Sequence, residues 1–175
     1  MRIRDATEQD FAGIARLTVE AYRALDTWVG DDYALTLADV AGRAWAPGNA
    51  VLVAEDEAGG RLLGSVTLTL EPGHYFEWAH GVDGDCGFRM LAVDPAAQGR
   101  GAGPALVAAC VERARAAGRR RMIIGSTEWM TTAHRIYERM GFRRVPELDQ
   151  QWGDIRGLCF RLDLTSDAEA DLTTT

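Results

Sequence analysis

The stretch VDPAAQGRGAGPAL, residues 93–106, says more about the architecture than any other part of the chain. An apolar strand ends at Asp94, and three glycines within five residues then lead into a helix-forming sequence. Glycine loses more conformational freedom on folding than other residues, so three together indicate that something approaches the main chain closely. The first turn of a helix has unpaired amide donors and a partial positive charge, so we expect a phosphate-binding loop here.

Two familiar nucleotide-binding loops do not fit these glycines. A Walker loop ends in Gly-Lys-Ser/Thr, and a dinucleotide-binding loop has the spacing G-x-G-x-x-G with an acid at the end of the next strand. Neither pattern is present. A tight strand-to-helix turn without a ligand also explains the glycines, and from the loop alone that alternative stays open.

The periodicity of the apolar residues predicts an α/β protein in which helices flank a mixed sheet. Two strands are expected around Gly59 and Gly60, because this dipeptide is a hairpin signal. The predicted strands are 2–5, two within 50–70, 86–93, 121–126, 142–145 and 157–164, and the predicted helices are 7–25, 35–45, 105–117 and 131–140.

The length and composition predict one domain over residues 1–165 and a disordered tail over 166–175. The chain has 175 residues, of which 47% are hydrophobic, and no linker-like stretch divides it. It begins with charged residues, and no apolar run approaches the roughly 20 residues that a membrane span needs. We therefore expect a soluble, cytoplasmic protein with no membrane partner.

The charge and the cysteines exclude several classes of protein. A net charge of -7 argues against nonspecific nucleic-acid binding and mildly favours a cationic partner. Three widely separated cysteines fit neither a disulfide framework nor a zinc site, so we expect ordinary buried or half-buried thiols. His74 and His80 lack a third ligand nearby, and we predict no metal.

A second motif, AHRIYERMGF at residues 133–142, follows the glycine loop after one helix and one strand. Together with MLAVDP and the spacing Gln98-x-x-Gly101-x-Gly103, it resembles the GNAT superfamily of acetyl-CoA-dependent N-acetyltransferases. The resemblance covers nearly the whole domain in the order of its elements. It implies a central mixed, twisted sheet of six to seven strands flanked by about four helices.

The resemblance also implies where acetyl-CoA, as co-substrate, binds. A bulge in residues 88–93 splays that strand from residues 121–126, and the pantetheine arm pairs with the main chain there as an added strand. The oxyanion of acetyl transfer meets a backbone amide near Leu91 or Ala92. The predicted cofactor-binding residues are Leu91, Ala92 and Val93 on the strand, and Gln98, Gly99, Arg100, Gly101, Ala102 and Gly103 around the pyrophosphate.

Tyr137 is the candidate proton donor, because in this family a tyrosine at the same helical position points at the thioester sulfur. A phenol with a pKa near 10 is a weak but usable acid for a thiolate. The alternative is a core tyrosine, since Ala133, Ile136, Tyr137 and Met140 form one apolar helical face.

The general base is less well defined by the sequence. Some relatives have a glutamate early in the splayed strand, but residues 86–88 here are Cys-Gly-Phe. Glu128 is the candidate, acting directly or through water, although an acid at this place also supports a helix N-terminus. Glu77 and Asp85 are weaker candidates, and water alone stays open as the base.

Two residues depart from the family pattern. Pro104 lies in the first helical turn and has no N–H, so it removes one donor from the anion cradle. Met130 stands where many relatives have an asparagine that contacts the cofactor arm. Thr131 or Thr132 would have to supply that polar contact.

The predicted acceptor is the amine of a small molecule. Residues 26–33 and 71–84 would build its pocket, with an acidic site from the carboxylates Glu71, Glu77, Asp83 and Asp85. The alternatives are a protein or peptide amine as acceptor, or a CoA-binding sensor without catalysis, and a homodimer stays open. We expect His134 to be solvated or capping, and the three arginines at 119–121 to form a solvated helix-to-strand junction.

Overall fold

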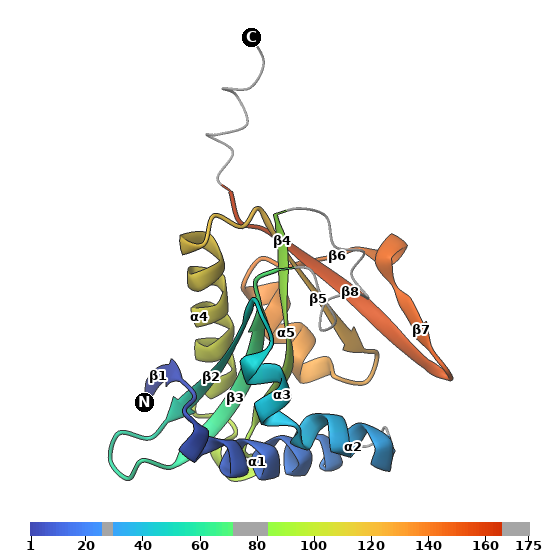
Figure 1. Cartoon of the computed structure of the whole chain (residues 1–175). Coiled ribbons are helices and arrows are strands. Elements are labelled where there is room, and N and C mark those ends of the chain that lie inside the picture. Colours follow the sequence, from blue (N-terminus) through green and yellow to red (C-terminus); the bar gives the residue numbers. More distant parts are fainter. Residues whose placement is uncertain (26–29, 72–83, 166–175) are drawn as a thin grey trace. The chain divides into compact units, whose positions relative to one another are not determined.

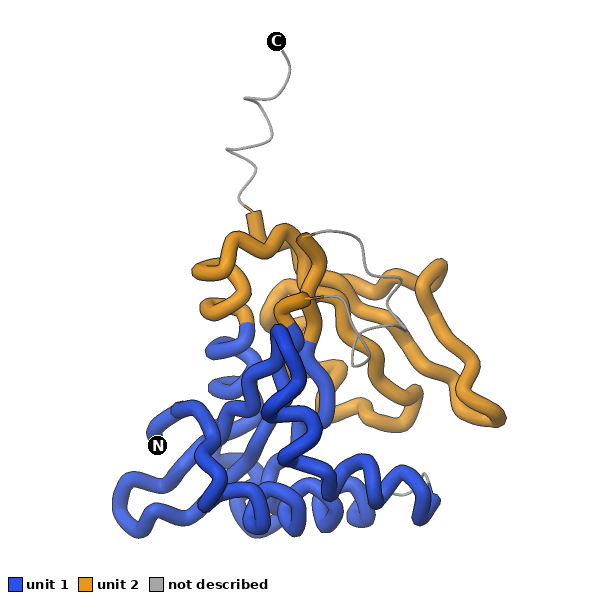
Figure 2. The backbone as a smooth tube through the Cα atoms, in the orientation of Figure 1, with its two compact units in different colours: residues 1–69, 88–110 blue, residues 70–87, 111–175 orange. Residues whose placement is uncertain are grey.

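A computed structural model of the chain describes residues 1–25, 30–71 and 84–165 (Figure 1). The chain divides into two compact units (Figure 2). The first consists of residues 1–69 and 88–110, and the second of residues 70–87 and 111–175. The predicted disordered tail, residues 166–175, lies outside the described residues.

The sheet is mixed, as the sequence predicts. Its strands hydrogen bond in the order β1-β2-β3-β4-β5-β8-β6, with β7 paired to β8. The strands are β1 Arg2–Asp5, β2 Asn49–Glu55, β3 Leu62–Thr69, β4 Asp85–Val93, β5 Arg121–Thr127, β6 Arg143–Arg144, β7 Gln150–Trp152 and β8 Ile155–Asp163. The α-helices are α1 Phe11–Arg23, α2 Asp31–Ala38, α3 Val40–Trp45, α4 Ala102–Ala116 and α5 Thr131–Arg139, and the 3-10 turns are η1 Glu8–Asp10, η3 Pro95–Ala97 and η4 Pro146–Leu148.

Both faces of the strands in the first unit are covered. Ile14 of α1 and Val40 of α3 pack with Val51 and Val53 of β2. On β3, a Cβ added to Gly64 would lie 3.1 Å from Leu106 of α4, so this helix closely approaches the strand. Burial on both faces explains why β2 has a continuous apolar run and why Ser65, Thr67 and Thr69 of β3 are buried along with their apolar neighbours.

The prediction of a single helix over residues 35–45 is wrong. It is broken at Asp39, whose ψ of 73° is not helical and whose carboxylate accepts a hydrogen bond from the Gly42 amide. The buried Arg43 guanidinium donates to the carbonyl oxygens of Leu37 at 2.9 Å and Asp39 at 3.0 Å. The arginine therefore satisfies carbonyls at the end of α2, and a new helix starts at the Asp39 cap.

In the second unit, β5 and β8 pair antiparallel along seven residues, from Arg121 opposite Asp163 to Thr127 opposite Gly157. Helix α5 packs on one face, where the Tyr137 ring lies 5.5 Å from Phe160. Leu148 of η4 packs against Ile123 and Cys159. Strand β7 was not predicted, because its sequence, QQW, is short and largely polar.

The three cysteines are buried thiols, as predicted. Burial raises the pKa of the Cys86 thiol to about 12 and that of Cys159 to about 11. Both are therefore inert, protonated thiols at neutral pH. In the described parts of the chain, no helix is long and apolar enough to cross a membrane.

Arg121 and Asp85 form a buried ion pair, which corrects two expectations. Arg121 Nε donates to Asp85 Oδ1 at 2.8 Å and its second nitrogen to Oδ2 at 3.0 Å. Asp85 is 1% exposed, so it is neither a solvated acceptor-site carboxylate nor an available base. The arginines at 119–121 are thus not simply solvated, since the hydrogen bonds to Asp85 raise the pKa of the Arg121 guanidinium.

We expect the two partners of this pair to respond unequally to mutation. Arg121→Gln leaves a buried carboxylate without its cation and should lower the free energy of unfolding by about 3 kcal/mol. Asp85→Asn leaves a guanidinium that is 35% exposed and still reaches water, so the loss should be about 1 kcal/mol. Urea denaturation at pH 7 measures both. Equal losses, or a larger loss for Asp85→Asn, would contradict this assignment.

Candidate functional site

The glycine loop joins β4 to α4 within the first unit. Asp94 starts it, accepting a hydrogen bond from the Ala96 amide at 2.8 Å. Gly99 and Gly101 have φ angles of 78° and 83°, which residues with a Cβ rarely adopt. A Cβ added at either position would meet nothing within 4 Å. The surface above this backbone is therefore open to a ligand.

The amides of the loop are not all equally available. The Arg100 amide donates to the Ala97 carbonyl at 3.3 Å, a weak bond that occupies it in part. The Ala105 amide donates to the Gly101 carbonyl at 3.1 Å. Ala102 and Gly103 open the helix, where amides have no acceptor within the helix. Pro104 follows them and contributes none, as expected.

Two ion pairs hold this loop to the turn between β2 and β3. Arg61 pairs with Asp94 at 2.5 Å, and Arg100 with Asp56 at 3.0 Å. The guanidinium groups hold the pKa values of the Asp94 and Asp56 carboxyls below their usual range. The Arg100 side chain therefore binds Asp56, and only the main chain of Arg100 is left for its predicted role in binding the pyrophosphate.

Strand β4 has one irregular residue in the stretch where a bulge was predicted. Met90 has a φ of 54°, in the left-handed region, although it is not glycine. The parallel pairing with β5 involves Asp85 and Cys86, at the start of the strand. Ala92 is buried and Leu91 and Val93 are half-buried, and a Cβ on Gly64 would lie 2.7 Å from the Ala92 carbonyl oxygen. This packing fixes the main chain just before the loop.

Tyr137 lies in the second unit and is 5% exposed. Its ring packs against Phe142 at 5.8 Å and Phe160 at 5.5 Å between centroids. These contacts give it a part in the core. They leave its predicted role as an acid untested, because a proton donor needs a fixed ring as well.

His134, one turn before Tyr137, is not the solvated or capping residue that the sequence suggested. Its Nε2 lies 3.1 Å from the Ser126 hydroxyl, and its ring packs at 5.0 Å from Phe160. Burial lowers the pKa of His134 from its usual 6.5, against smaller raising effects from the Thr127 carbonyl and Glu138. The Ser126 hydroxyl also reaches Met130 Sδ at 3.5 Å.

Two buried polar atoms at the end of β5 have no hydrogen-bond partner among the described residues, and no sequence pattern singled them out. They are the Thr127 hydroxyl and the indole nitrogen of Trp129. An unpaired buried donor costs free energy, so such atoms favour a ligand that pairs with them. Their only sequence signal is polar capacity at the carboxyl end of a strand, where ligands commonly bind in α/β sheets.

The remaining predicted site residues receive less support. Glu128 is exposed and lies two residues before Met130, the cap of α5, without bonding to that helix end. Glu71 is exposed and 3.7 Å from Arg119. Residues 26–29 and 72–83, which hold Glu77, Asp83 and much of the predicted acceptor pocket, lie outside the described residues. Among the residues that are described, no group of three histidines, cysteines or acids could hold a metal ion.

The sequence matches the model of the acetyltransferase (GNAT) family over residues 12–142. Three solved structures illustrate the shared fold. A GCN5-related N-acetyltransferase from Kribbella flavida is 25% identical with a TM-score of 0.68, covering 93% of this chain and 97% of its own. The structure of yncA from Salmonella typhimurium with its cofactor acetyl-CoA is 24% identical, with a TM-score of 0.65 and 95% of each chain covered.

The third, a ribosomal-protein-alanine N-acetyltransferase from Brucella melitensis, is 22% identical with a TM-score of 0.66 and covers 94% of this chain and 100% of its own. No curated protein matches the sequence significantly. The fold and the family match define the class: this is an enzyme of the N-acetyltransferase type. The chain belongs to the acetyltransferase (GNAT) family, which confirms the resemblance seen in its two motifs.

Gly101→Val should weaken CoA binding by about tenfold or more, because its branched side chain covers the open loop backbone. The left-handed φ of Gly101 adds strain of about 1–2 kcal/mol, which the fold must absorb. Gly153→Val is the matched control, since Gly153 has a φ of 60° and is equally open, in the turn between β7 and β8. Calorimetric titration with CoA measures both variants. Unchanged affinity in folded Gly101→Val would remove the loop from the cofactor site.

His134 should make stability depend on pH. Its pKa is lower in the folded than in the unfolded state, so the unfolded chain binds more protons below about pH 6.5. The stability that neutral His134 contributes is therefore present above pH 6.5 and is lost as pH falls through the folded-state pKa. His134→Gln should reduce the pH dependence of the free energy of unfolding between pH 7 and pH 5, measured by urea denaturation. A variant lacking the other two histidines, His74→Gln/His80→Gln, should keep the slope, and loss of the slope there would refute the assignment.

Proposed function

We propose that the protein transfers an acetyl group from acetyl-CoA directly to the amine of a small molecule. The observation that carries the proposal is the glycine loop, where two left-handed glycines leave the main chain open next to a helix start. Backbone donors at a helix N-terminus suit a pyrophosphate without needing a basic side chain. The structure of the Salmonella typhimurium relative with acetyl-CoA supports the choice of ligand.

In this proposal the main chain does the binding. The amides of Gln98, Gly99, Gly101, Ala102 and Gly103 hold the pyrophosphate, with a smaller share for Arg100 because its amide is partly occupied. Leu91, Ala92 and Val93 receive the pantetheine arm, in line with the packing that fixes β4 there. An amide of Leu91 or Ala92 donates to the carbonyl oxygen as that oxygen gains negative charge.

Acetyl-CoA supplies the activated acyl group. The acceptor nitrogen forms the new bond to the acyl carbon, the carbon–sulfur bond breaks, and the sulfur leaves with the bonding electrons. We assign the proton that the sulfur then takes to the Tyr137 hydroxyl. The nitrogen gives up a proton in turn, to water or to Glu128, whose exposure supports the route through water.

The small-molecule acceptor is preferred over a protein, although two similar structures have names that specify ribosomal-protein-alanine acetylation. An acidic acceptor site must now rest on Glu71 and on carboxylates outside the described residues, since Asp85 is bound to Arg121. Thr127 and Trp129 add two unpaired donors that an acceptor or the cofactor arm could satisfy.

The decisive experiment is a thermal-shift screen with acetyl-CoA and CoA, followed by thiol release over small amines, N-terminal peptides and lysine peptides. All 19 basic residues of the chain are arginines, so the enzyme carries no lysine of its own. Any acetyl-lysine that forms must therefore lie on the acceptor. Release with small amines only supports the proposal, release with peptides only overturns the acceptor class, and binding without release favours a sensor.

Tyr137→Phe separates an acid from a core residue. It keeps the ring that packs on Phe142 and Phe160 but removes the proton, so turnover should fall about 10²-fold or more with little change in acetyl-CoA affinity or melting temperature. A core tyrosine would instead lose about 1 kcal/mol of stability with near-normal turnover. The measurement is steady-state thiol release across pH on one accepted amine, beside calorimetric binding. Turnover within about threefold of wild type would exclude the acid role.

A further inference from the structure

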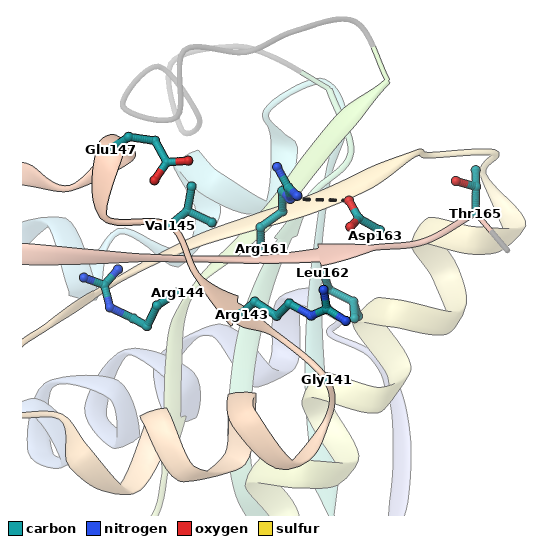
Figure 3. Close-up of a pocket in the computed structure, with 9 residues that line it drawn as sticks. All are labelled: Gly141, Arg143, Arg144, Val145, Glu147, Arg161, Leu162, Asp163 and Thr165. Carbon is teal, nitrogen blue, oxygen red and sulfur yellow. Dashed lines mark ion pairs between the residues drawn. The ribbon is translucent and has the colours of Figure 1, made fainter. Parts of the chain in front are cut away.

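A polar hollow of about 440 Å³ lies in the second unit, at the end of the sheet where β5 begins (Figure 3). Gly141, which follows α5, residues of β6 and η4, and the end of β8 line it. None of these residues belongs to the glycine loop or to the predicted catalytic pair. Its volume falls in the range of pockets that bind small organic molecules, about 300–1,000 Å³.

Three arginines line this hollow, and they differ in how well they are neutralised. Arg144 donates to both carboxylate oxygens of Asp149 at 2.8 Å and lies over the Phe160 ring, so its charge is satisfied. Arg161 has one contact, from Nε to Asp163 Oδ1 at 3.4 Å, with 39% and 58% of the two side chains exposed. Such an exposed, long contact is worth little.

Arg143 is the third, and within residues 1–25, 30–71 and 84–165 it has no ion-pair partner. Its register partner across the antiparallel pair of β6 and β8 is Arg161. This register places the two main chains side by side, although the two side chains run in different directions. In Figure 3 Arg161 lies beside Asp163 on one side of β8, whereas Arg143 extends alongside Leu162.

We propose that this hollow binds a small organic anion with two acidic groups, one held by Arg143 and the other by Arg161. A planar guanidinium matches a carboxylate or a phosphate with two parallel hydrogen bonds. One inorganic anion would occupy only a small part of the space, whereas a ligand with two anionic groups reaches both arginines.

The acids of the hollow limit which anions bind. Glu147 is exposed on the same lining, and Asp163 competes for Arg161. A monoanion can pair with only one guanidinium and is repelled by the carboxylates of Glu147 and Asp163, so it should bind weakly. A dianion or trianion gains both guanidiniums. The proposal is independent of the acetyl-transfer site, because it uses none of the residues assigned there.

The test is calorimetric titration of the full chain with citrate, inorganic pyrophosphate and acetate at constant ionic strength, with and without saturating CoA. Citrate, pyrophosphate or both should bind saturably to the wild type in the presence of CoA, and at least about tenfold more tightly than acetate. Which of the two binds distinguishes a carboxylate from a phosphate ligand. Absence of saturable binding by both at millimolar concentrations would overturn the proposal.

Variants locate the site. Arg143→Gln/Arg161→Gln should abolish saturable binding of the anion while leaving CoA affinity unchanged. Arg115→Gln/Arg135→Gln removes two exposed arginines outside the hollow, so it is the charge-matched control and should bind the anion within about twofold of wild type. Equal losses in the control, or loss of CoA binding in the double variant, would show that the hollow is no separate site.

Discussion

The ion pair between Asp85 and Arg121 fixes the start of the parallel pairing between β4 and β5. The two residues stand opposite each other in register, and Cys86 opposite Met122 follows. Because side chains alternate along a strand, a slip of one residue would turn every later side chain of β4 to the other face. A charged pair that bonds through two nitrogens resists such a slip, since a shifted register would leave Asp85 buried and unpaired.

Within the first unit, packing and ion pairs hold the glycine loop. Phe88, Met90 and Ala92 are the buried residues of β4 beyond Gly87, and Leu91 and Val93 are half-buried. The strand thus reaches Asp94 with its position set by packing, and the loop starts from a fixed point. The ion pairs of Asp94 with Arg61 and of Arg100 with Asp56 then hold the loop to the turn between β2 and β3. Main-chain amides can serve as a preorganised binding surface only when the backbone is held in this way.

The sequence predicted what depends on backbone chemistry and missed what depends on distant partners. Gly99 and Gly101 were singled out because clustered glycines indicate a close approach to the main chain, and the structure shows both with positive φ angles and open space at the Cβ position. The break at Asp39 was missed, since it depends on a buried arginine that bonds to carbonyls of the preceding helix. The role of Arg121 was missed because Asp85 is 36 residues away. The unpaired Thr127 and Trp129 atoms become visible only when burial is known.

The use of arginine connects the two candidate sites. Every basic residue of the chain is an arginine, and many of the described ones bond to acids with short contacts: Arg4 to Asp10 and Glu55, Arg61 to Asp94, Arg121 to Asp85 and Arg144 to Asp149. In a chain with a net charge of -7, acids are abundant and a guanidinium finds a partner easily. Arg143 and Arg161 stand out against that background, because within the described residues Arg143 has no acidic partner and Arg161 has only a long contact to Asp163. The glycine loop follows the opposite principle, since its anion is to be held by amides while its one arginine, Arg100, is bound to Asp56. In the two proposals, main-chain amides bind the cofactor, and the side chains of Arg143 and Arg161 bind a different anion.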